Sequence, residues 1–197
     1  MKNMLVKFTT LLAVIAGGLI STPTVFAASG NWTNLTSSVW SAATNWNPNV
    51  VPGTAAGDVV SLTNNIGAAL TITLDQSATV GTLNLGDSAS TFYAFTLTPA
   101  VAQTLTFNNN GNGTKLTQSI TTASDVISTP IALADNLTVT NTSTLTLTNI
   151  ISGTGYGITK LGSGTLVLGG SNTFSGGLTV SNGTLNVTNS YARAAAI

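Results

Sequence analysis

Residues 160–187 of this 197-residue chain read KLGSGTLVLGGSNTFSGGLTVSNGTLNV, and this stretch decides the expected fold. Two short runs of alternating apolar and polar residues are joined by glycine-rich turns. The run at 164–168, GTLVL, returns nineteen residues later as GTLNV at 183–187. A period of about twenty residues is the length of one turn of a β-solenoid. The stretch therefore predicts two strands that occupy equivalent places on successive coils.

The composition is typical of an exposed but uncharged β-structure. The chain has five basic and five acidic residues, no histidine and no cysteine, and its mean hydropathy is +0.38. Glutamate is absent and lysine and arginine are scarce, whereas threonine and valine, which suit a pleated sheet, are abundant. We therefore expect helix only at the N-terminus. Nucleic-acid binding needs a stripe of basic side chains, and the scattered cations argue against it.

Residues 1–27 have the three parts of a secretory signal peptide. Lys2 and Lys7 supply the positive start, residues 8–20 form an apolar run, and a polar segment leads to a cleavage point after Ala27. The alternative is a transmembrane anchor, but an apolar run of about thirteen residues is shorter than the ~20 that a membrane-spanning helix needs. The sequence therefore predicts a helical signal peptide and export through the Sec pathway.

Residues 28–58 contain all three tryptophans, Trp32, Trp40 and Trp46. One interpretation is an N-terminal cap, because a β-solenoid needs an atypical terminal unit that covers its core and its unpaired strand edge. The other interpretation is a platform on which sugar rings stack. We favour the cap, and the sugar platform stays open at this point.

Short alternating runs begin at Val59 and predict half-buried strands. In residues 70–74, LTITL, the apolar residues occupy every second place, so they point to one side and the threonines to the other. Residues 121–135 are the least regular part, and strands resume at 136–149. The strands expected before the irregular part are 59–63, 69–75, 79–86, 92–98, 104–108 and 115–120.

Two all-β architectures fit such strands, an antiparallel sandwich and a right-handed parallel β-helix. The Gly-Thr-Leu motif at 81–85, 164–168 and 183–187 favours the β-helix, because equivalent strands recur on successive coils of a solenoid but not in a sandwich. We predict coils over residues 59–197, with leucine and valine inside. Threonine and asparagine are expected to form outer ladders whose side chains hydrogen-bond along the axis.

The same stretch resembles the autotransporter-associated β-strand repeat, and residues 160–187 carry the resemblance. It implies a β-helical passenger domain of a type V secretion protein or a large secreted bacterial surface protein. A second region, Trp40 to Val60, is similar to the opening that often follows the signal peptide in such proteins. The matching positions in the repeat are Lys160-x-Gly162-x-Gly164-Thr165-Leu166-x-Leu168-x-Gly170-x-Asn172-Thr173-Phe174-x-Gly176-Gly177-x-Thr179-Val180-x-x-Gly183-Thr184-Leu185.

Members of this family are commonly much longer, and the autotransporters end in an outer-membrane barrel, whereas this sequence stops at Ile197. We therefore expect an N-terminal fragment that reaches the outer membrane only through a missing C-terminal region.

No catalytic, cofactor-binding or metal-binding residue is predicted. Without histidine, cysteine and glutamate, the usual triads, thiol nucleophiles, zinc sites and glutamate pairs cannot be built. Aspartates are the remaining candidates for acid–base catalysis. Because polysaccharide-cleaving β-helices use aspartate clusters, a secreted enzyme of this kind is the alternative to a non-enzymatic scaffold. Each aspartate lies singly beside turn residues, where it ordinarily caps a bend. These residues are Asp58, Asp75, Asp87, Asp125 and Asp135.

The sequence thus predicts an exported, non-enzymatic β-helical surface scaffold that needs no cofactor. The family resemblance implies adhesion or cell-surface interaction, with host or surface glycans or proteins as possible partners, and a location at the cell surface, in the outer membrane or outside the cell. The alternative function is a secreted β-helix that binds or cleaves polysaccharides.

Overall fold

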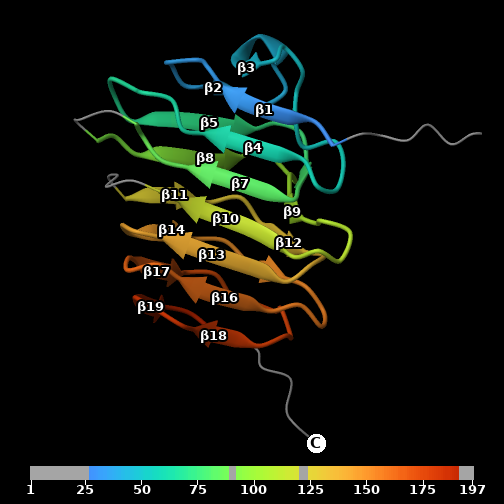
Figure 1. The fold of residues 1–197 in the computed structure, drawn as a ribbon, viewed down its shortest axis with the longest axis vertical. Coiled ribbons are helices and arrows are strands. Elements are labelled where there is room, and N and C mark those ends of the chain that lie inside the picture. The colour runs from blue at the N-terminus through green and yellow to red at the C-terminus, as the bar shows by residue number, and fades with distance from the viewer. Residues whose placement is uncertain (1–26, 89–91, 120–123, 191–197) are drawn as a thin grey trace, which may run out of the picture.

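The computed structural model describes residues 27–88, 92–119 and 124–190. They form a parallel β-solenoid of about five turns, and Figure 1 shows the coils stacked with the N-terminal ones at the top and the C-terminal ones at the bottom. Nearly all neighbouring strands in the described ranges are parallel, the pair β1 and β3 being antiparallel. The predicted solenoid is therefore confirmed over the sandwich, whose strands would be antiparallel.

The coils between residues 59 and 152 pass through three sheets, A, B and C, in that order, whereas the coil that starts at Ile158 has strands only in sheets A and B. Sheet A contains β1 (Ser29–Trp32), β3 (Trp46–Asn47), β4 (Val59–Leu62), β7 (Thr82–Leu85), β10 (Thr114–Gln118), β13 (Leu137–Asn141), β16 (Ile158–Leu161) and β18 (Leu178–Val180). Sheet B contains β2 (Ser38–Val39), β5 (Leu70–Leu74), β8 (Phe95–Pro99), β11 (Asp125–Ile127), β14 (Leu145–Leu147), β17 (Thr165–Leu168) and β19 (Thr184–Val187). Sheet C contains β6 (Ala78–Val80), β9 (Leu105–Phe107), β12 (Ile131–Leu133) and β15 (Ile151–Ser152).

Alternation along the strands produces the core. In β5 the residues Leu70, Ile72 and Leu74 are buried, while the two threonines between them lie on the outer surface and are half-buried. Leucines stack in register from coil to coil, as Leu145 and Leu166 do in sheet B. Burial of one such side chain contributes roughly 1.5–3 kcal/mol, so stability is distributed along the axis.

The Gly-Thr-Leu motif is not one repeated position, and this part of the prediction was wrong. Residues 82–85 form β7 in sheet A, whereas residues 165–168 and 184–187 form β17 and β19 in sheet B. The two later copies do stack, because Thr165 lies opposite Thr184 at the predicted step of nineteen residues. The motif marks any strand that starts at a glycine corner, so it recurs at more than one corner of the coil.

Two expected boundaries also change. The run 79–86 is split at Gly81 into β6 of sheet C and β7 of sheet A. A side chain at Gly81 would lie 2.7 Å from the backbone of Gly57, so the chain turns there against the previous coil. The region 121–135 is less irregular than predicted, since it contributes β11 and β12 on either side of the turn at Pro130.

The outer ladders form, but the threonines in sheet B do not hydrogen-bond along them. A side-chain bond of the expected kind joins Asn84 to the hydroxyl of Ser61 on the coil before it, at 3.3 Å. Stacked strands lie ~4.8 Å apart, and an O–H···O bond spans only ~2.8 Å. Threonines with the same rotamer are therefore too far apart to bond, whereas the longer asparagine reaches.

The predicted signal peptide lies outside the described residues apart from Ala27, so its helix and its cleavage point stay predictions. The right-handed sense of the coil and the segment boundary at residue 58 also stay predictions. The described ranges contain one helical element, a short 3-10 turn at Ala43–Asn45. None of their helices has the length and apolar character needed to cross a bilayer.

Candidate functional site

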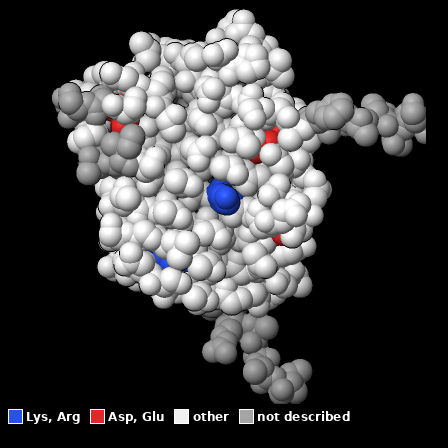
Figure 2. Space-filling view, in the orientation of Figure 1, with Lys and Arg blue, Asp and Glu red and all other residues white. Residues whose placement is uncertain are grey.

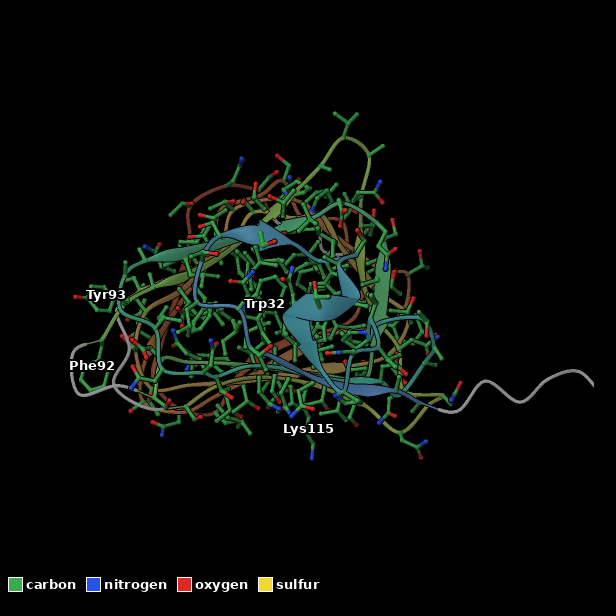
Figure 3. All side chains as sticks on the ribbon, turned by 90° about the horizontal axis from the view of Figure 1, so that it is seen from above. Trp32, Phe92, Tyr93 and Lys115 are labelled. Carbon is green, nitrogen blue, oxygen red and sulfur yellow. The ribbon has the colours of Figure 1, made fainter. Side chains whose placement is uncertain are left out.

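The three tryptophans lie inside the first coils and not on the surface. Trp32, Trp40 and Trp46 are 1%, 0% and 1% exposed. Trp46 packs edge-on against Trp32 and Trp40, with ring centroids 5.1 and 4.8 Å apart. Figure 3, which looks along the stack, shows Trp32 in the interior. The indole faces are therefore covered by protein and do not form an exposed platform for sugar rings.

Each indole N–H also has an acceptor. Trp32 donates to the carbonyl of Asn34 at 2.7 Å, and Trp46 donates to the carbonyl of Trp40 at 2.7 Å. Trp40 donates to the carbonyl of Pro52 at 3.0 Å. Because buried N–H groups need partners, these bonds hold the loop around 34–52 against the top of the stack.

Asp58 organises the turn that enters β4. It is 0% exposed, and its Oδ1 accepts the N–H of Ala28 at 2.7 Å. Its Oδ2 accepts the N–H groups of Gly53 at 2.7 Å, Thr54 at 2.9 Å and Ala55 at 3.4 Å. A carboxylate offers about four acceptor sites, so one side chain satisfies a whole turn and ties it to the start of β1.

The other aspartates also accept several hydrogen bonds, and each bonds to a preceding coil, with Asp125 at the start of strand β11 and the other three in connecting segments. Asp75 accepts the N–H and the hydroxyl of Ser41. Burial alone would raise the pKa of Asp75, but these bonds from Ser41 outweigh burial and hold the pKa below its ordinary value. The remaining acceptors are Asp87 for the N–H groups of Ile66 and Tyr93, Asp125 for the N–H of Phe95 and the amide of Gln118, and Asp135 for the N–H groups of Asn109 and Gly111.

The structure therefore gives four aspartates a role in holding turns, whereas Asp125, at the start of β11, joins the start of β8 to the side chain of Gln118. No three carboxylates of the described ranges gather in a group that could hold a metal ion. The assignment of no catalytic, cofactor-binding or metal-binding residue stays a prediction.

Lys160 is a buried cation in the C-terminal coils. It is 0% exposed and occupies an inward column, opposite Val139 of the coil before. Its Nζ donates to the carbonyls of Leu161 at 2.7 Å, Gly162 at 2.8 Å and Asn182 at 3.3 Å. Burial lowers the pKa of the Lys160 ammonium. The three donors are thus all used, and the side chain joins the turn of one coil to the turn of the next.

Glycines let the C-terminal turns touch one another. A side chain on Gly164 would lie 2.1 Å from the carbonyl oxygen of Ser143, and one on Gly170 would lie 2.1 Å from that of Asn149. No Cβ atom tolerates such contacts, so only glycine permits this approach of backbone to backbone. The stacking of these coils therefore depends on missing side chains.

The last coil is uncovered. Val180 and Val187 are 45% and 38% exposed, whereas Leu166 in the coil before is fully buried. Phe174 fills the interior, and Val187 ends the last strand. The general expectation that leucines lie inside is only partly met at Leu185, because this side chain is half-buried.

One C-terminal segment contains Lys160, the glycine contacts and the tight turns. The stacked coils define the chain as a β-solenoid repeat protein. The family model of the passenger-associated-transport-repeat matches residues 158–187, which run from β16 to β19. Neither the curated proteins nor the solved structures gave a match. The chain thus carries a passenger-associated transport repeat and fits an autotransporter passenger repeat protein, as the resemblance predicted.

Sequence reasoning assigned no interior role to Lys160. A signal was present, because Ile158 and Lys160 occupy alternate places in a strand whose inward positions are apolar. A lysine at an inward position has two explanations. Either the inward and outward faces of the strand have been assigned the wrong way round, or backbone carbonyls surround the buried ammonium. The carbonyls that accept from this ammonium belong to two turns about twenty residues apart in the sequence, and only the stacking of the coils brings the two turns together.

Proposed function

We propose that this chain is the exported part of a β-helical passenger, a non-enzymatic scaffold that serves adhesion or cell-surface interaction in a longer protein. One observation supports it above the others: the passenger repeat at 158–187 forms regular coils of a stacked solenoid with a continuous apolar core. Such a stack presents long outer faces at fixed spacing, which suits a display scaffold. Host or surface glycans or proteins are the proposed partners.

The N-terminal segment has two parts in this proposal. Residues 1–27 direct export through the Sec pathway and are removed. Residues 28–58 form the cap, which is supported by the burial of the three indoles at the end of sheet A beside β3. An end covered in this way leaves little core or strand edge for unwanted association.

Export is tested with the full chain fused to alkaline phosphatase, a reporter that is active only after translocation. We expect an active fusion whose mature N-terminus is Ala28 by mass spectrometry. Leu12→Arg, which places a charge in the apolar run, should leave an inactive precursor inside the cell. The matched control Thr10→Arg lies at the edge of that run and should be exported. An uncleaved, inactive wild-type fusion would contradict the exported scaffold.

Adhesion is tested by coating beads with the purified protein and measuring their attachment to bacterial and host cells. Attachment above that of albumin-coated beads is the expected result. A glycan array on the same preparation separates the alternative, since cleavage of a polysaccharide by the folded protein would make it a carbohydrate-acting β-helix. No attachment and no glycan binding would remove the adhesion role.

A further inference from the structure

The outer surface of sheet B has an unusual composition, and we call it the hydroxyl face. Its central residues come from β5, β8, β11 and β14 and the positions that directly follow β11 and β14. None is charged and none is aromatic. They are Thr71, Thr73, Thr96, Thr98, Val126, Ser128, Thr146 and Thr148.

These residues form two columns in register along the solenoid axis. Thr71 lies opposite Thr96, and Val126 lies between Thr96 and Thr146. Thr73 lies opposite Thr98, and the second column continues through the residues that follow Ile127 and Leu147, which are themselves paired. The groups of one column are thus ~4.8 Å apart, and the two columns are ~6.7 Å apart along each strand.

The threonine hydroxyls of this face are available to solvent. Among the described residues no hydrogen bond within the chain uses the hydroxyls of its six threonines, whereas Ser128 donates to the carbonyl of Leu97 at 3.2 Å. The threonines are half-buried by their neighbours in the column or, at Thr148, exposed. Rigid strands therefore hold an array of unbonded hydroxyls with methyl groups between them.

The spacing of this array matches that of tetrahedral water. Two hydrogen bonds of ~2.8 Å that meet on one water at a tetrahedral angle span ~4.6 Å, close to the ~4.8 Å between stacked strands. One water can therefore bridge two hydroxyls on adjacent strands, such as Thr71 with Thr96 and Thr73 with Thr98, whereas Val126 contributes only methyl groups to the first column. A row of such waters repeats the arrangement of oxygens in ice.

Sheet A differs because one of its outer columns contains a charged side chain. In its outer column Lys115 stands between Thr82 and Thr138, and the side chain is exposed. Figure 3 shows Lys115 pointing away from the coil, and Figure 2 shows a basic side chain protruding from an otherwise largely uncharged surface. A strongly hydrated ammonium interrupts a water lattice. Sheet C has only four strands of two or three residues, so it offers a narrower surface.

We propose that the hydroxyl face binds ice. The face has no charged side chain that would bind a charged partner, and no aromatic side chain on which a sugar ring would stack. Binding to an ordered water surface requires neither kind of side chain. The inference rests on the geometry of sheet B and is independent of export and of adhesion to cells.

The experiment measures the growth of ice crystals by microscopy, and the partition of the purified full-length protein into a slowly growing ice front. Thr96→Tyr with Thr146→Tyr places two bulky rings in the column. The matched control is Thr138→Tyr with Thr159→Tyr, at the outer positions of adjacent coils in sheet A. Circular dichroism and the urea midpoint establish that each variant is folded.

We expect the wild type and the sheet A variant to slow crystal growth and to enter the ice, and the sheet B variant to lose both effects while folded. A folded wild type that neither slows growth nor enters the ice overturns the proposal, as does an equal loss in both variants. Should sheet B variants instead lose binding to crystalline cellulose, with no effect of the wild type on ice, the face recognises a sugar lattice and the proposal is wrong.

Discussion

The N-terminal and C-terminal coils keep the same fold by different physical means. All five aspartates lie between residues 58 and 135 and accept charge-assisted hydrogen bonds from backbone N–H groups, and four of them hold turns in this way. The described coils after residue 136 contain no carboxylate side chain, and their turns touch through glycines and the caged Lys160. Long turns need a side chain that satisfies several donors, whereas short turns leave no room for one.

Coil length is more variable in the region with aspartates. In sheet A the chain takes 33 residues from Thr82 to Lys115 and 23 from Lys115 to Thr138, whereas it takes 20 from Thr159 to Thr179. A longer coil must order more backbone, at about 1–2 kcal/mol of conformational entropy per residue. A solenoid can therefore accept turns of variable length where carboxylates bind the turn N–H groups. Where glycine contacts take the place of these carboxylates, the turns are short.

The two ends of the stack provide the largest test of the comparison. Trp40→Ala should destabilise the protein by about 3–5 kcal/mol, because it removes a large, fully buried side chain. Val180→Ala should change the free energy of unfolding by less than about 1 kcal/mol, because Val180 is 45% exposed in the last coil. Urea unfolding followed by tryptophan fluorescence, with circular dichroism for Trp40→Ala, measures both. Similar losses would mean that the last coil is covered in solution.

The glycine turns provide the second test. Gly164→Ala should cost about 1–3 kcal/mol, because the new methyl group meets the backbone of Ser143. Gly177→Ala is the matched control in the same repeat. It has no atom within 4 Å of its Cβ position, so the variant should be neutral or stabilised by up to about 1 kcal/mol. The measurement is the urea unfolding midpoint of each variant relative to the wild type. An unchanged midpoint for Gly164→Ala would contradict the close contact with Ser143.

The carboxylate turns provide the smallest test, through pH. The pKa of Asp75 is lowered in the folded state, so its stabilisation is present above the unfolded value of 3.8 and is lost as the pH falls through the folded value. Because Asp75 is only partly covered, the effect should stay below about 1 kcal/mol. Asp75→Asn should therefore be less stable than the wild type at neutral pH, and the difference should shrink in acid.

Hydrogen exchange in acid locates this effect. Protection of the amides in β5 should fall before that of β17, whose coils have no carboxylate to protonate. A uniform loss of protection along the stack would contradict the division between the two kinds of turn.

The alternating pattern of leucine and threonine determined the strands and the inward and outward faces, since the two sides of a pleated strand meet different environments. Regular spacing in residues 160–187 was enough to predict the nineteen-residue step of the last coils, because their turns are short and equal. The family resemblance rested on the same regular glycines. These properties are local, and a linear sequence records them directly.

Only the tertiary structure decided which strands stack on which. Gly-Thr-Leu at 81–85 and at 164–168 look alike yet lie in different sheets, because the number of residues per coil varies before residue 136. The roles of Asp58, Lys160 and the three tryptophans were decided in the same way. Their hydrogen bonds and ring contacts join segments that are distant in the sequence, and the stacking of the coils brings those segments together.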